Sequence, residues 1–243
     1  MGGVTAALLA REGLIGPLTA LDGAAGFFHI YLGGQPARLR EILLDRGKWF
    51  SAATSIKPWP CCRLSHPYVA VALALRERGM DASIERIVIA VNASAAKLCR
   101  PLAERCAPQT LQDAKYSIPF MVTFALMHGA PGLRSLNAAA LDDPTVLALA
   151  ARIDIDECLP DEPGHPPAEI ELIAAGRCIA GPAAPSFELD EGGARSKFLD
   201  CLAYAGSSPA DAAARWDLLA GFDRLAPGQW WSALQQPVAA PLP

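Results

Sequence analysis

The chain has 243 residues, of which 52% are hydrophobic and 19% are charged, and its formal net charge is −4. This length suits one large domain or two smaller ones and is enough to bury a sizeable core. Lysines and arginines are scattered and form no basic stripe, so nucleic acid is not an expected partner. No apolar run approaches the roughly 18 residues that a membrane span needs, so no membrane association is expected.

The cysteines and histidines show no metal-ligand spacing. The seven cysteines, at positions 61, 62, 99, 106, 158, 178 and 201, are odd in number. Their pattern favours reduced, mostly buried thiols in the cytoplasm over a disulfide framework. The four histidines fall in neither a Cys-x-x-Cys nor a His-Glu-x-x-His frame, so no zinc site is expected. The first residues lack the basic n-region of a signal peptide and predict a helix instead.

The first fifty residues predict mainly helical structure. Residues 3–12 form a helix that Gly13 ends, and residues 17–26 predict a second, shorter helix. The apolar run over residues 27–32 fits either a helix or a strand. Apolar residues at helical spacing predict a further helix over residues 36–44.

The sequence pattern changes after residue 49. Pro58 and Pro60 exclude a regular helix there and predict an extended segment that connects two structural regions. The block that follows mixes helices and strands. It predicts helices over residues 67–78, 111–127 and 144–151, strands over 84–91 and 152–156, and a hairpin over 169–179 that turns near Ala175 and Gly176. The long helix over residues 111–127 is expected to bend or break at Pro119. After a Pro/Ala/Gly linker, helices are predicted over residues 196–205 and 209–225.

The order of helices, mixed block and helices predicts an α+β fold in which a smaller α/β domain is inserted into a helical domain. The expected segments are residues 1–55, which begin the helical domain, residues 56–184, which form the insertion, and residues 185–243, which return to the helical domain.

The densest group of chemically useful residues is Lys57-Pro-Trp-Pro-Cys-Cys-Arg-Leu-Ser-His-Pro67. Lys57 and Arg63 are fixed cations near His66, and the predicted helix that follows presents its N-terminus. Such a group favours carboxylate binding, and a histidine beside it can move a proton. On spacing alone, however, a histidine before a helix is more often a cap or a packed residue.

A second polar group is Lys115, Tyr116 and Ser117, on an otherwise apolar helix. The proline that follows frees a backbone carbonyl. Without further information, these residues are interpreted as the solvated first turn of a core helix.

Five segments in the same order along the chain carry a family resemblance. They are Gly3-Val-Thr-Ala-Ala-Leu-Leu-Ala-Arg-Glu-Gly-Leu-Ile-Gly-Pro17, Lys57 to Arg63 with His66-Pro67, Ala114-Lys-Tyr-Ser-Ile-Pro-Phe120, Asp143 to Ile153, and Lys197-Phe198. Together they resemble the MmgE/PrpD family, which includes 2-methylcitrate dehydratase, cis-aconitate decarboxylase and related epimerases. The resemblance implies a helical domain with an α/β insertion, usually dimeric, and a reaction without metal or organic cofactor.

The resemblance also implies roles for individual residues. His66 falls on the family's active-site histidine and is expected to act as a general acid/base. Lys57 and Arg63 are expected to hold carboxylates and to stabilise the charge that develops next to them. Lys115 and Ser117 are further candidates for substrate binding. The family's tyrosine in the same helix is Phe120 here, so a catalytic phenol would have to come from Tyr116.

Two departures from the family pattern qualify this expectation. The N-terminal half of the helical domain, with its acidic and histidine site residues, is absent from the sequence, and residues 183–193 replace the usual Gly-x-Pro-x-Asn-Pro loop. We therefore expect a lyase or isomerase for a small di- or tricarboxylic acid, working as a homodimer or with a complementing chain that carries the N-terminal half. A truncated, inactive fragment and a carboxylate-binding protein remain as alternatives. Apolar residues such as Leu8, Leu9, Phe27 and Phe28 predict self-association of the isolated chain.

Overall fold

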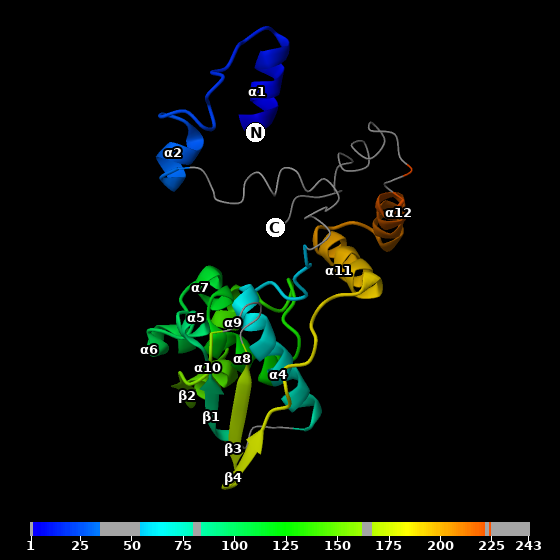
Figure 1. Cartoon of the computed structure of the whole chain (residues 1–243). Coiled ribbons are helices and arrows are strands. Elements are labelled where there is room, and N and C mark those ends of the chain that lie inside the picture. Colours follow the sequence, from blue (N-terminus) through cyan, green and yellow to red (C-terminus); the bar gives the residue numbers. More distant parts are fainter. Residues whose placement is uncertain (1, 35–53, 80–83, 162–166, 222–223, 225–243) are drawn as a thin grey trace. The chain divides into compact units, whose positions relative to one another are not determined.

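The computed structural model describes residues 2–34, 54–79, 84–161, 167–221 and 224 (Figure 1). The chain divides into two compact units, Met1–Thr54 and Ser55–Pro243, which are considered separately. The described residues contain helices together with a mixed sheet, so the predicted α+β class is confirmed. The return of residues 185–243 to the first helical segment stays a prediction.

The first unit contains two helices in its described part, α1 (Gly2–Arg11) and α2 (Phe27–Leu32). The apolar run over residues 27–32, which fitted either a helix or a strand, is helix α2. Gly33 ends this helix in the left-handed conformation. The expected helix over residues 17–26 is wrong. These residues form successive turns instead, and the two glycines within them, Gly23 and Gly26, disfavour helix. The helix predicted over residues 36–44 lies outside the described residues.

The apolar side chains of this first unit are largely exposed. Helix α1 buries none of its residues, although it contains Leu8 and Leu9. The exposed large apolar residues of the described part are Val4, Leu8, Leu9, Leu14, Ile15, Leu18, Leu21, Phe27, Ile30 and Tyr31. The periodicity of α1 therefore marks a helix correctly without showing what the helix packs against.

The second unit is built on a four-stranded sheet within the described residues, in the order β2-β1-β3-β4. Strand β1 (Ile84–Ala90) pairs in parallel with β2 (Ile153–Asp156) and antiparallel with β3 (Glu169–Ala174), which continues into β4 (Arg177–Ala180). Ala175 and Gly176 both have positive φ angles, of 49° and 69°, as a tight two-residue hairpin requires. The strand and hairpin predictions are confirmed.

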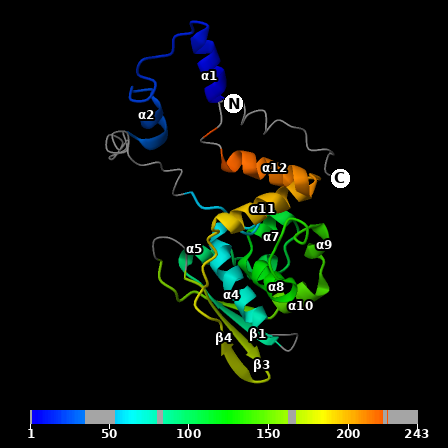
Figure 2. The ribbon, with the colours of Figure 1, turned by 90° about the vertical axis from the view of Figure 1, so that its right-hand side faces the viewer.

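Helices α4 (His66–Glu77) and α8 (Ile118–His128) pack against each other, and α4 also contacts β3. Helix α4 lies against the sheet (Figures 1 and 2). Helix α8 also packs on α10 (Pro144–Ala150), which Asp143 caps as the sequence predicts. Short helices that were not predicted as separate elements complete the unit: η2 (Arg63–Ser65), α5 (Ala93–Ala96), α6 (Leu102–Cys106), α7 (Leu111–Lys115) and α9 (Ala138–Leu141). The core lies between these helices and the sheet.

The long helix expected over residues 111–127 is broken earlier than predicted, at Tyr116 and Ser117. Ser117 is the N-cap of α8, and its hydroxyl accepts a hydrogen bond from the backbone N–H of Phe120 at 3.0 Å. Pro119 then occupies the first turn of α8, where its missing N–H leaves no helical hydrogen bond unmade. The proline starts the helix instead of bending it.

Two helices follow the sheet, α11 (Glu191–Tyr204) and α12 (Pro209–Ala220), and they pack against each other. Helix α11 begins five residues before the predicted start, because the Asp190 side chain caps it by accepting the Gly193 N–H at 2.7 Å. Helix α12 ends at Ala220, before the predicted end. Among the described residues, no helix combines the length and the apolar character that crossing a membrane requires.

Candidate functional site

The loop that carries the candidate site runs from residue 57 into α4. The backbone N–H of Cys62 donates to the carbonyl oxygen of Lys115 at 2.8 Å, which ties this loop to the junction between α7 and α8. Residues 63–65 make one turn of 3₁₀ helix, and α4 starts at His66 with Pro67 in its first turn. The two polar groups noted in the sequence therefore lie on neighbouring loops.

The imidazole of His66 is fully buried and held from one side. Its Nδ1 lies 2.9 Å from the carbonyl oxygen of Cys62 and 3.7 Å from Sγ of Cys61. Because a carbonyl only accepts, Nδ1 must carry the hydrogen, and Nε2 holds the lone pair of the neutral ring. Nε2 is buried and makes no hydrogen bond to any residue that the structure describes.

Two aromatic side chains enclose the His66 ring. Trp59 stacks on it with ring centres 5.4 Å apart and planes 28° apart, and Phe187 lies 5.5 Å away at 44°. Trp59 and Phe187 also approach each other, at 6.3 Å. We call His66, Trp59 and Phe187 the aromatic cluster. Its two aromatic side chains help to remove the ring of His66 from water.

Burial lowers the pKa of His66, because the charged form of the ring is poorly solvated. The carbonyl of Cys62 opposes this effect, the cations Arg63 and Lys57 add to it, and the carbonyl of Trp59 opposes it weakly. At neutral pH the ring is therefore uncharged and in the form that accepts a proton. Burial also raises the pKa of the Cys61 thiol, to about 12, so its neighbour is a neutral thiol.

The structure places the two expected cations beside this ring in different ways. Arg63 forms an ion pair with Glu188, and its guanidinium lies 5.6 Å from the centre of the Phe187 ring. The Lys57 ammonium donates to the carbonyl of Cys61 at 3.2 Å, and the side chain is exposed. Both positive charges act on His66, which is consistent with the electropositive setting that the sequence indicates.

The remaining predicted site residues lie at the α7–α8 junction. Lys115 is half-buried and contributes its carbonyl to the loop contact with Cys62. Tyr116 is 46% exposed. The Ser117 hydroxyl is buried, donates to the carbonyl of Arg105 and caps α8. These contacts give Ser117 a structural role, and substrate binding by Lys115, Tyr116 and Ser117 stays a prediction.

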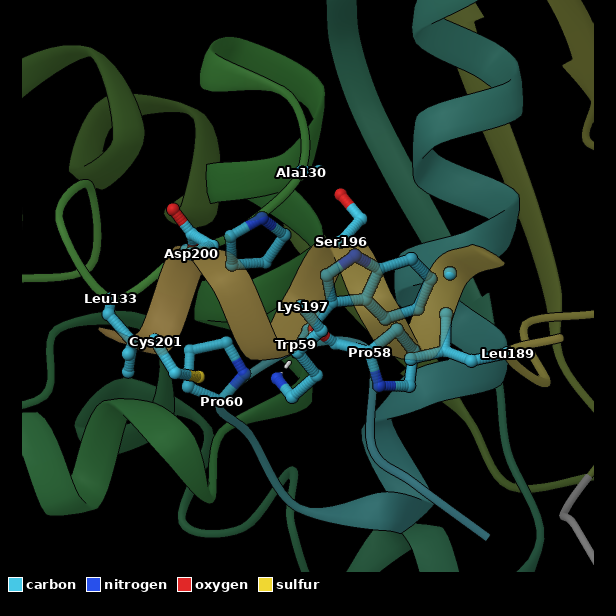
Figure 3. Close-up of a pocket in the computed structure, with 13 residues that line it drawn as sticks. Pro58, Trp59, Pro60, Ala130, Leu133, Leu189, Ser196, Lys197, Asp200 and Cys201 are labelled. Carbon is cyan, nitrogen blue, oxygen red and sulfur yellow. Dashed lines mark hydrogen bonds between the residues drawn. The ribbon is translucent and has the colours of Figure 1, made fainter. Parts of the chain in front are cut away.

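A pocket of about 470 Å³ is lined by Trp59 of the aromatic cluster (Figure 3). Helix α11 contributes Ser196, Lys197, Asp200 and Cys201, and the loop opposite contributes Pro58, Trp59 and Pro60. The Lys197 ammonium donates to the carbonyl of Pro58 at 3.1 Å. Trp59 lines the pocket and stacks on His66, whereas His66 itself does not line it. Trp59 is thus the side chain that the pocket and the aromatic cluster share.

Sequence reasoning missed Trp59, Phe187, Glu188 and Lys197 as parts of this site. Trp59 lies inside the segment that contains His66, so an aromatic side chain close in sequence to the candidate histidine was a usable signal. Phe187 and Glu188 follow the Pro/Ala/Gly linker, in the stretch that departs from the family's loop, and only the fold brings them to residue 63. Among the described residues, no three His, Cys, Asp or Glu side chains are grouped so that they could hold a metal ion.

Comparison with known families assigns the centre of the chain. Residues 59–168 match the family model described as the MmgE/PrpD C-terminal domain. No curated protein matches the chain. The matched range contains Trp59, Arg63, His66 and the α7–α8 junction, and it ends before Phe187 and Lys197. Over residues 59–168 the chain is thus similar to the C-terminal domain of the MmgE/PrpD family.

Proposed function

We propose that His66 is the general acid/base of a cofactor-independent lyase or isomerase that acts on a small di- or tricarboxylic acid. Members of the MmgE/PrpD family, whose C-terminal domain residues 59–168 resemble, are generally lyases or dehydratases, and this supports the proposed reaction class. The observation that carries the proposal is the lone pair of His66 Nε2, buried with no hydrogen-bond partner among the described residues. A structural histidine would be expected to use both ring nitrogens.

The proposed reaction begins with proton transfer from a carbon next to a carboxylate to Nε2 of His66. The C–H bond breaks, an N–H bond forms, and the electron pair moves onto the carboxylate. In a dehydration, this pair then forms the C=C bond while the C–O bond to a neighbouring hydroxyl breaks. The imidazolium returns its proton to the departing hydroxide, which leaves as water and restores the neutral ring.

The nearby cations fit the charge that this step develops. A carboxylate that receives an electron pair carries nearly two negative charges, and a fixed guanidinium or ammonium stabilises it more than the starting carboxylate. Arg63 suits this role, because its planar group binds carboxylates with two parallel hydrogen bonds. Lys57 would hold a second carboxylate. The hydrogen bond from Nδ1 to the Cys62 carbonyl fixes the tautomer in which Nε2 is the base.

The aromatic cluster buries His66, which favours the neutral form of this proposed base but also blocks access to it. An imidazole whose pKa burial lowers is neutral at physiological pH and ready to accept a proton. Substrate has to reach Nε2 past Trp59 or Phe187, since the ring is 0% exposed. The exposed apolar residues of the first unit support a homodimer as the working assembly.

A second candidate function is carboxylate binding without turnover. It is favoured by the same cover: His66 does not line the pocket, whereas Lys197 does. A protein that only binds an acid would keep the cations and would not need an accessible base. This alternative predicts that replacing His66 leaves ligand affinity intact and removes no rate.

The deciding experiment incubates the purified full chain with citrate, 2-methylcitrate and cis-aconitate and follows the conjugated alkene by ultraviolet absorbance. His66→Gln is expected to lower any rate by about 10²- to 10⁴-fold, the usual contribution of a general acid/base. His128→Gln is the matched control, because His128 pairs with Asp143 at the start of α10 and takes no part in the proposed reaction. A His66→Gln variant with the full rate of the unaltered chain would exclude the proposal. No rate at all, with an affinity for these acids that His66→Gln does not change, would establish the binding function.

A further inference from the structure

The segment between β4 and α11 is anchored at both ends and irregular between them. We call residues 182–189 the strap; it runs beside α4 between the hairpin and α11 (Figure 1). At one end, the N–H of Gly181 donates to Ile170 at 2.7 Å, and a Cβ at this glycine would lie 2.6 Å from Cγ1 of Val71. At the other end, Asp190 caps α11. The strap is therefore an irregular segment between two fixed points.

Two neighbouring residues of the strap point at the candidate site. Phe187 lies against His66 at 5.5 Å and against the Arg63 guanidinium at 5.6 Å. Glu188 forms the ion pair with Arg63. The Glu188 carboxylate thus pairs with Arg63, the cation that the proposed reaction assigns to a carboxylate of the substrate. The adjacent Phe187 covers His66, the proposed base.

We propose that Phe187 and Glu188 are the closed gate of the His66 site, and that a ligand opens it by replacing the Glu188 carboxylate at Arg63. This inference rests on the proposed function for its ligand class, but not for the closed state itself. Once Glu188 is released, the strap between Gly181 and Asp190 moves away from Arg63 and takes Phe187 off the imidazole. Nε2 then becomes accessible to the carbon next to the bound carboxylate.

The strength of the contact suits such an exchange. The side chains of Arg63 and Glu188 are 27% and 48% exposed, and ion pairs of this exposure are weak and readily exchanged. A monocarboxylate would only substitute one carboxylate for another and would have little advantage over Glu188. An acid with two or three carboxylates can also bind Lys57, whose ammonium otherwise bonds the Cys61 carbonyl. The gate therefore selects polycarboxylates over monocarboxylates.

The strap lies outside the matched range of residues 59–168, so the proposed gate is not part of the matched domain. A change in this segment can alter access to His66 without altering the residues that surround its ring nitrogens.

The closed gate is tested by diethyl pyrocarbonate labelling of the full chain, with peptide mapping by mass spectrometry. This reagent acylates neutral imidazole, so slow labelling of the uncharged His66 reports coverage, and the exposed His128 in the same molecule is the internal reference. Relative to His128, His66 is expected to react about two- to fivefold faster in Glu188→Gln, the range that an exposed ion pair supports. In Phe187→Ala the increase is expected to be about tenfold or more, because an aromatic contact is lost as well.

The matched control is Glu157→Gln, which removes the exposed Arg100–Glu157 pair and should leave His66 labelling unchanged. Thermal melting checks that Phe187→Ala is folded, and the conservative Glu188→Gln keeps the test valid if it is not. Unchanged His66 labelling in Glu188→Gln would overturn the gate. An equal increase in Glu157→Gln would overturn it too, since the effect would then not be specific to the strap.

The exchange is tested separately by calorimetric titration with propane-1,2,3-tricarboxylate and with acetate. Glu188→Gln is expected to bind the tricarboxylate about two- to fivefold more tightly than the unaltered chain, because the internal competitor is gone. If Glu188→Gln and the unaltered chain bound the tricarboxylate with equal affinity, the proposed exchange at Arg63 would be overturned. Labelling needs no turnover, so the two proposals fail differently. Faster His66 labelling in Glu188→Gln, without turnover of any acid, would exclude the proposed function but not the gate. Turnover that depends on His66, with unchanged His66 labelling in Glu188→Gln, would exclude the gate but not the proposed function.

Discussion

Helices α1 and α8 are both rich in apolar residues, and both are predicted by the sequence, but the fold treats them differently. Residues 118–126 of α8 are all buried, and the helix packs against α4, α10 and α6. Helix α1 buries none of its residues, and Leu8 within it is 47% exposed. The difference teaches that apolar spacing identifies a helix, whereas burial depends on partners that lie elsewhere in the chain or on another molecule.

The largest expected effect comes from making one substitution on both sides of this comparison. Leu75 on α4 is 0% exposed and packs in the same core as α8. Leu75→Ala is expected to lower the free energy of unfolding by about 2–5 kcal/mol, whereas Leu8→Ala on α1 should change it by about 0.5 kcal/mol or less in dilute solution. Urea denaturation of the full chain measures both.

Protein concentration sharpens this result. If α1 packs against a second molecule, Leu8→Ala should become more costly as the concentration rises, because the self-association predicted from its exposed apolar residues stabilises the folded chain. A Leu8→Ala cost that matched that of Leu75→Ala and did not depend on concentration would contradict the contrast between the two helices.

The next effect concerns the start of α8, where Ser117 was predicted to bind substrate and is observed as a cap. Ser117→Ala removes the hydroxyl that accepts from Phe120 and donates to Arg105. It should cost about 1–2 kcal/mol of stability, because a buried partner is left unsatisfied. Ser196→Ala, at an exposed position of α11, is the control and should cost about 0.5 kcal/mol or less. Unchanged stability together with weaker binding of carboxylates would favour the substrate role instead.

Much of the second unit follows from local signals in the sequence. The β-branched residues of β1, the turn at Ala175 and Gly176, and the cap at Asp143 each identify an element without tertiary information. The break at Tyr116 was missed because Pro119 suits either the bend of a long helix or the first turn of a new one. The outcome depended on the buried hydroxyl of Ser117.

The candidate site was predicted only where its residues are close in sequence. Lys57, Arg63 and His66 belong to one loop, so their spacing was visible. The contact of Arg63 with Glu188 joins residues 125 positions apart, and no local pattern indicates it. The contact of Phe187 with His66 has the same origin, because it also joins residues that are far apart in the sequence.

A smaller effect is expected at the start of α10, which packs on α8. Asp143 accepts hydrogen bonds from Thr145 and Val146 and pairs with His128, and the Thr145 hydroxyl is the main cause that lowers the pKa of Asp143 to about 2. Asp143→Ala should cost about 1 kcal/mol at neutral pH, and Asp142→Ala, next to it and without the cap, should cost about 0.5 kcal/mol or less.

The stability difference between Asp143→Ala and the unaltered chain should depend on pH. The pKa of Asp143 falls from 3.8 to about 2 on folding, so its charge stabilises the fold above pH 3.8. That contribution is lost as the pH falls towards 2, and the difference between Asp143→Ala and the unaltered chain should shrink over the same interval. A difference that grew on acidification would show that the carboxylate is not the stabilising form.

The smallest expected effect lies at the edge strand β2, whose Asp154 pairs with Arg86 of the neighbouring strand β1. The two side chains are 55% and 54% exposed, so Asp154→Asn should cost only about 0.2–1 kcal/mol at low salt. Glu85→Gln, which removes an exposed charge from the same β1, is the control. At about 1 M salt, where charges are screened beyond about 3 Å, the cost of Asp154→Asn should fall to that of the control. A cost that persisted in high salt would assign the stabilisation to packing of the aliphatic part of Arg86, and this edge would then resemble the buried side of the comparison more than its exposed side.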